Sequence, residues 1–168
     1  MLEPKLISKA GIPAALKKAT RYRLLGEPLQ AESICRDILT VEPENQQALI
    51  TLLLAVSDQF EKELAGTFDV AKAILPKIKG DYEQAYYEGI IHERWGNAQL
   101  SKGMQTSIGW YRAAMRSYAK AEELSDSDND DAVLRWNTCV RIIQRHDFVP
   151  EEITHDINAQ YGDDVPLR

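Results

Sequence analysis

A spacing of small and large apolar residues recurs three times along this chain and limits the folds that it can adopt. A small residue comes first, a larger one follows four positions later, and a medium one follows three positions after that. The three sets are Ala31, Cys35 and Ile38; Ala71, Leu75 and Ile78; and Ala114, Tyr118 and Ala121. These offsets place each set on one helical face, where a small residue lets two helices cross closely. The sets begin 40 and 43 residues apart, a period typical of stacked helical hairpins.

Proline, glycine and capping residues predict where the helices begin and end. Pro13 and Pro28 suit first turns, Gly26 suits the left-handed residue that ends a helix, and Thr67 is a candidate N-cap. Pro76 predicts a kink or an early end. The expected helices are Pro13 to Leu25, Pro28 to Val41, one from Glu44 that can extend through Phe60 to Leu64, Thr67 to Gly80, Tyr82 to Leu100, Ser107 to Leu124, one capped by Asp130 or Asp131 that ends near His146, and a short one from Pro150. No stretch of the sequence sustains the alternation of a strand, so we predict an all-α fold.

The helix that begins near Glu44 is apolar almost all round, with Leu49, Leu53 and Val56 among its residues. Such a helix has no polar face to turn toward solvent. We therefore expect it to lie buried between its neighbours.

The repeated sets resemble the second helix of the tetratricopeptide repeat. Pro43 follows the first set as the terminating proline of that signature, whereas Asp126 stands in the same place after the third set. Ala85, Gly89 and His92 keep the glycine of the first-helix signature. The resemblance covers roughly residues 12–145. It implies antiparallel hairpins stacked as a short right-handed α-solenoid of about three repeats plus C-terminal capping helices. The repeats of this chain depart from the family in being longer than its 34 residues. We assign residues 1–147 to this array and residues 148–168 to a capping helix and an acidic tail.

The charge of the chain argues against nucleic-acid binding. Its formal net charge is −6, whereas nucleic-acid binders concentrate basic residues on one face. The charge is uneven, with a net of +5 over residues 1–25 and −8 over residues 121–168. Opposite charges at the two ends allow copies to meet end to end, although unevenly solvated surfaces are the simpler explanation.

The cysteines and the apolar runs of the sequence indicate the cellular compartment in which the protein is expected. Cys35 and Cys139 are isolated, which favours a reducing compartment over a disulfide framework. The first residues contain no apolar signal-peptide core, and the longest apolar run, from Ala48 to Val56 apart from Thr51, is about half of what spans a bilayer. We expect a cytoplasmic protein without membrane insertion.

Two patterns suggest a metal site, and the spacing disfavours both. Asp126, Asp128 and Asp130 have the spacing of an EF-hand opening, but Asp131 replaces the required glycine and Asn137 the bidentate glutamate. Glu88 and His92 lie one turn apart without a third ligand, and zinc needs at least three. The sequence also lacks a phosphate-binding glycine loop and nucleophile motifs. We expect no metal, no cofactor and no enzymatic activity.

The resemblance implies a concave surface, lined by the first helix of each hairpin, that takes a peptide or a helix from a protein partner. The inward positions are Leu16, Thr20, Arg23, Ile50, Leu54, Tyr86, Ile90, Arg94, Leu134, Thr138 and Arg141. This set is mainly apolar with three arginines at its edge, and it lacks the Lys and Asn of the carboxylate-gripping variants. We therefore expect an adaptor or scaffold that binds an apolar segment, with or without an acidic residue.

Two alternatives remain open. Ile153, Ile157 and Tyr161 form a stripe that can fill the groove of the same chain or of a neighbour, which would make the protein a self-associating assembly factor. The lower-ranked alternative is a small metal-binding protein or enzyme that uses Glu88 and His92.

Overall fold

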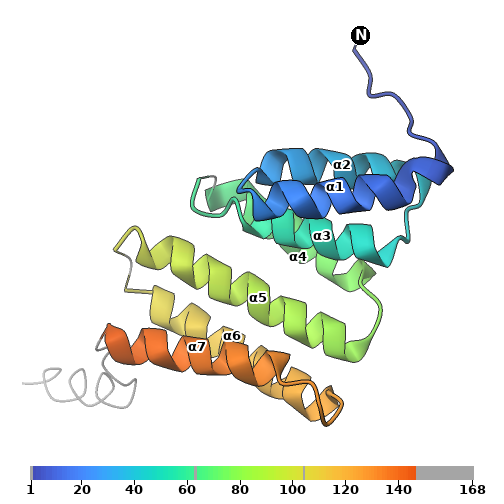
Figure 1. Ribbon diagram of the computed structural model, residues 1–168. Coiled ribbons are helices and arrows are strands. Elements are labelled where there is room, and N and C mark those ends of the chain that lie inside the picture. The colour runs from blue at the N-terminus through green and yellow to red at the C-terminus, as the bar shows by residue number, and fades with distance from the viewer. Residues whose placement is uncertain (1, 63, 104, 147–168) are drawn as a thin grey trace, which may run out of the picture.

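The computed structural model describes residues 2–62, 64–103 and 105–146 as a set of packed helices (Figure 1). Seven α-helices lie in these ranges: α1 (Ile12–Leu24), α2 (Pro28–Val41), α3 (Gln46–Ser57), α4 (Leu64–Ile74), α5 (Asp81–Leu100), α6 (Ser107–Leu124) and α7 (Asp131–Arg145). Two 3-10 turns, η1 (Lys9–Gly11) and η2 (Leu75–Lys77), precede α1 and follow α4. The described ranges contain no strand, which confirms the prediction of an all-α fold.

Each helix packs against the next one along the chain, and α3 also contacts both α1 and α5. In Figure 1 the odd-numbered helices lie nearest the viewer, with α4 partly covered by α3 and α6 by α7. We call the surface formed by α1, α3, α5 and α7 the odd-helix face. Tight turns permit this arrangement, and Gly26 between α1 and α2 has the predicted left-handed conformation, with a φ of 77°.

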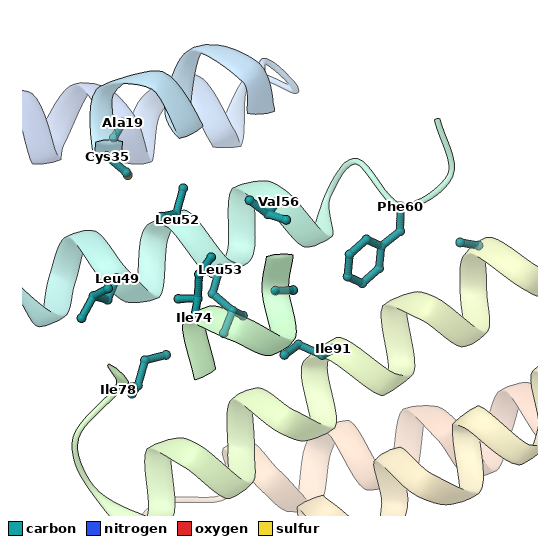
Figure 2. Packing of buried hydrophobic residues seen from close by; sticks show 12 residues of the cluster. Ala19, Cys35, Leu49, Leu52, Leu53, Val56, Phe60, Ile74, Ile78 and Ile91 are labelled. Atoms are coloured by element: carbon teal, nitrogen blue, oxygen red, sulfur yellow. The ribbon is translucent and has the colours of Figure 1, made fainter. Parts of the chain in front are cut away.

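Helix α3 lies at the centre of the first apolar core, as its sequence predicts. Leu53 and Val56 are almost completely buried, and they belong to a cluster with residues from α1, α2, α4 and α5. Figure 2 shows Leu52 pointing toward Ala19 and Cys35, whereas Leu53 points toward Ile74 and Ile91. Side chains on opposite sides of α3 therefore join the first helices of the chain to the middle ones.

A second apolar cluster joins α5, α6 and α7. Its centre is Tyr118, whose side chain is fully buried against the glycine at position 89. Ala114 and Ala121, the two small members of the third repeated set, are also fully buried. The third set thus provides the close helix contact that its spacing predicts.

Several predicted boundaries are wrong, and the reasons are local. Helix α3 ends at Ser57 because the chain turns over residues 58–62, so it does not extend through Phe60. Helix α4 begins at Leu64, which places Thr67 inside the helix rather than at its cap. Asn45 caps α3 by accepting a 3.0 Å hydrogen bond from the Ala48 backbone N–H. The early end predicted at Pro76 is confirmed, since α4 gives way to η2 there.

The predicted capping helix and acidic tail, residues 148–168, lie outside the described residues, as does the stripe of Ile153, Ile157 and Tyr161.

Candidate partner-binding face

The predicted site residues come from the four helices of the odd-helix face. Leu16 and Thr20 of α1 line a pocket of about 580 Å³. The pocket lies between α1 and the start of α3, and Lys9, Lys17 and Gln47 also contribute to its wall. This face therefore offers a hollow with Ile12, Pro13 and Leu16 on its apolar side and with polar and charged residues, Glu42 and Asn45 among them, around the rest.

Two of the three predicted edge arginines meet at a single carboxylate. Arg23 Nε of α1 lies 2.8 Å from Asp58 Oδ2, and Arg94 Nη1 of α5 lies 2.8 Å from Asp58 Oδ1. Arg94 also donates to the Leu54 carbonyl oxygen at 2.9 Å and to Ser57 Oγ at 2.6 Å. Since Asp58 is the C-cap of α3, these contacts fasten three odd-numbered helices together at one end of the face.

Arg94 is mostly buried, with 16% of its side chain exposed. Burial lowers the pKa of its guanidinium, and Asp58 opposes this by favouring the charged form. Arg23 and Arg135 further lower the pKa of Arg94 through charge repulsion. The face thus gathers several guanidinium groups, but two of them form ion pairs with Asp58, so their first role is to hold the helices together.

Tyr86 belongs to a polar and aromatic network beneath the face. Its ring stacks on Tyr82 with the ring centroids 5.8 Å apart and also contacts Tyr118. Arg135 of α7 reaches the same place, where it interacts with Tyr86 and pairs with Glu93 at 3.1 Å. Tyr118 donates a 2.5 Å hydrogen bond to the other oxygen of Glu93. One buried carboxylate on α5 therefore binds both α6 and α7.

The structure moves Ile90 from the predicted site to the core. Only 2% of Ile90 is exposed, and it packs in the second cluster with Tyr111 and Tyr118. A partner cannot reach it on this surface. Ile90 lies one turn from both Tyr86 and Arg94, but α5 is buried on more than one side, and Gly89, Ile90 and Ile91 are all buried.

The α7 residues of the predicted site are exposed. Leu134 is 62% exposed, and Thr138 and Arg141 are exposed as well. The Thr138 hydroxyl donates to the Leu134 carbonyl oxygen within the helix. Ile50 and Leu54 of α3 are half-buried, so the apolar side chains that this face presents come from α1, α3 and α7.

Each of the two candidate metal ligands, Glu88 and His92, contacts another side chain in the structure. Glu88 accepts a 3.1 Å hydrogen bond from Ser117 Oγ and pairs with Lys72 at 3.6 Å. The His92 ring lies against Trp110, with the centroids 5.7 Å apart. Within the described ranges no three His, Cys, Asp or Glu side chains gather as a metal site would require. In the aspartate turn, Asn129 Oδ1 accepts a hydrogen bond from the Asp131 backbone N–H.

Neither of the two carboxylates that organise the face, Asp58 and Glu93, belongs to the set of residues predicted from the sequence. Glu93 had a detectable signal, because it follows Ala85 and Gly89 on the buried side of α5 at helical spacing. A charged residue in such a register needs partners. Asp58 had no comparable signal, since it lies where α3 ends and its two arginines come from distant parts of the chain.

None of the helices in the described part of the chain combines the length and apolar character needed to cross a membrane. Comparison with known protein families, with curated proteins and with solved structures gave no match to this chain.

Proposed function

We propose that this chain is a non-enzymatic adaptor, built as a tetratricopeptide-like solenoid, whose odd-helix face binds an apolar segment of a protein partner. The observation that carries this proposal is the pocket of about 580 Å³ lined by Leu16 and Thr20. It lies on the face that the resemblance assigns to ligands. The partly exposed Ile50 and Leu54 and the exposed Leu134 continue the apolar surface across α3 and α7.

The chemistry of the face favours an apolar ligand over an acidic one. Arg23 and Arg94 are already paired with Asp58, and Arg135 is paired with Glu93. A partner carboxylate would have to compete with these internal pairs. Burial of an apolar side chain in the pocket has no such competitor and releases water from apolar surface.

The proposal is tested by selecting peptides from a random library on the full chain and measuring their affinity by fluorescence anisotropy. The test variant carries Leu16→Asp and Leu134→Asp, which place charges at the half-buried Leu16 and the exposed Leu134 of this face. The matched control is Leu29→Asp, since Leu29 is an exposed leucine (63%) of α2, outside this face.

We expect selected peptides with an apolar centre to bind the unmodified chain and the Leu29→Asp control alike. They should bind the double variant about tenfold more weakly or worse, because each charge removes an apolar contact. Equal binding to all three proteins, or no selection of any peptide, contradicts the proposal. Circular dichroism spectra of the three proteins must agree for the comparison to hold.

A further inference from the structure

A second apolar hollow lies between α2 and α4, and the proposed function does not use it. Two pockets, of about 440 and 300 Å³, share Val70 as a lining residue and so form one groove. Leu49, Leu52 and Val56 of α3 form its floor. These side chains lie on the opposite side of α3 from Ile50 and Leu54, so the groove is separate from the odd-helix face.

The walls of this groove leave apolar surface exposed. Leu29 of α2 is 63% exposed and Val70 of α4 is 37% exposed. Charged side chains lie along the rim, with Arg36 and Lys77 beside the larger pocket and Glu32 beside the smaller one. An extended or helical segment with apolar side chains on one side fits a hollow of this kind.

The first residues of the chain form an arm with matching properties. Residues 2–8 contain no helix or strand, and Leu2 and Leu6 of this arm are exposed, Leu2 fully and Leu6 to 77%. Ile7 fixes the base of the arm by packing against the cluster of Ile12, Ile38 and Ala48. The arm passes Asp37 and Thr40 of α2, and Thr40 also lines the groove. Figure 1 shows the arm leaving the helices on the side away from α4.

We propose that two copies of the chain exchange these arms, so that Leu2 and Leu6 of each copy lie in the α2–α4 groove of the other. In an extended arm Leu2 and Leu6 point to the same side, about 13 Å apart. The floor of the groove from Leu49 to Val56 is about 10 Å long, and its α2 wall from Leu29 to Leu39 is about 15 Å long. The spacing of the two leucines is therefore comparable with the length of the groove.

The side chains of an extended arm alternate, so Glu3 and Lys5 point away from the groove and stay in solvent while Leu2 and Leu6 enter it. The direction of the arm favours exchange over insertion into its own groove, because the arm leads away from α4 (Figure 1). Two identical arms that enter two identical grooves close a two-fold dimer without leaving a free site.

The first test is sedimentation equilibrium of the full chain over a range of concentrations. We expect a monomer–dimer equilibrium that Leu2→Ser with Leu6→Ser weakens about tenfold or more, and that Val70→Asp weakens similarly. Leu134→Asp is the control, since it changes an exposed leucine of the odd-helix face, and it should leave the dimer intact.

A monomer at all concentrations overturns the proposal. A dimer that survives the arm variant but is lost with Val70→Asp also overturns it, because another segment would then occupy the groove.

The second test distinguishes exchange from insertion in one chain. A Leu6→Cys protein is mixed with a Val70→Cys protein under mild oxidation, and we expect a disulfide-linked heterodimer. Cys35 and Cys139 are fully buried, so they do not compete. A chain that carries both Leu6→Cys and Val70→Cys is oxidised in parallel. If the mixture gives no heterodimer and this chain forms a disulfide within itself, the arm occupies its own groove and the exchange is wrong. The variant with Leu16→Asp and Leu134→Asp separates this inference from the proposed function. If it loses peptide binding but still forms the dimer, the two properties depend on different surfaces.

Discussion

The ring of Tyr118 occupies the space directly above the α-carbon of Gly89. A Cβ atom at position 89 would lie 2.6 Å from Tyr118 Cδ1 and 2.9 Å from Cζ. The ring cannot move aside easily, because it is fully buried and its hydroxyl donates to Glu93. Helices α5 and α6 therefore cross at a distance that only glycine permits at this position.

Gly89→Ala should destabilise the fold by about 1–3 kcal/mol, the usual cost of forcing an extra carbon into a packed core. The matched control is Gly109→Ala, because Gly109 is exposed in α6 and a Cβ there would meet no atom within 4 Å. Alanine should stabilise that helix by about 0.5–1 kcal/mol. Urea unfolding followed by circular dichroism measures both changes, and equal effects of the two substitutions would contradict the packing that we describe.

Glu93 is the second point at which α5, α6 and α7 are joined. Glu93 is 3% exposed and lies between the Tyr118 hydroxyl and the Arg135 guanidinium. Glu93→Gln keeps the shape but removes the charge, so both partners lose a charge-assisted hydrogen bond. We expect a loss of about 2–3 kcal/mol in the free energy of unfolding.

A double-mutant cycle with Tyr118→Phe checks that the two groups act together. Residues in one hydrogen-bond network show coupling energies of about 0.5–3 kcal/mol. Additive effects of Glu93→Gln and Tyr118→Phe would mean that the hydrogen bond does not contribute to stability. Ser117→Ala serves as a control on the same helix, since Ser117 binds Glu88 rather than Glu93.

Periodicity and local signals were sufficient to predict most of the helices. The boundaries of α2 and α6 match the prediction. Pro28 and Pro43 mark the two ends of α2, polar loops mark the ends of α6, and all of these signals are local in the sequence. Helix α4 was placed less well, since Thr67 is a good N-cap in isolation while the structure continues the helix back to Leu64. Local preference is a weak guide where neighbouring helices decide the boundary.

The candidate site was harder to predict than the helices. The resemblance assigns positions to a face, and this placed Leu16, Thr20 and Leu134 on accessible surface. It also placed Ile90 there, although that side chain is buried, and it assigned ligand-binding roles to arginines that pair with Asp58. Such pairings join residues 35 or more positions apart in the sequence, and a single sequence contains no direct signal for them.

His92 should make the stability of the fold depend on pH. Burial lowers the pKa of His92, and the charges of Lys72 on α4 and Arg116 on α6 lower it further, whereas Glu88 on α5 raises it. The unfolded chain, with a histidine pKa of about 6.5, therefore binds this proton more readily than the folded chain. Stability should fall as the pH decreases below about 6.5, and this contribution should level off below the folded pKa.

His92→Gln removes this contribution, so the urea midpoint of the variant should change less between about pH 7 and pH 5 than that of the unmodified chain. If the variant shows the same dependence on pH as the unmodified chain, the buried His92 does not couple folding to protonation.

Both cysteine thiols should resist modification while the chain is folded. Burial raises the pKa of Cys35 and of Cys139 to about 12, and the thiolate is the form that reacts. A coloured thiol reagent should label neither residue at neutral pH and should label two thiols per chain in concentrated guanidinium. Fast labelling of one thiol in the absence of denaturant would show that the helices around it open locally.

Asp58 should contribute more to stability than an exposed ion pair does. Asp58→Asn leaves Arg23 and Arg94 without their anionic partner, and Arg94 is only 16% exposed. A buried charged group that loses its partner in this way costs about 1–3 kcal/mol. Lys79→Met is the control, because it breaks the 2.9 Å pair of Lys79 and Glu44, whose side chains are 68% and 82% exposed. That change should have little effect on the free energy of unfolding, because fully exposed ion pairs contribute little to stability. Urea unfolding gives both values, and a cost for Asp58→Asn no larger than the control would show that the arginines of the odd-helix face are free to bind a partner carboxylate.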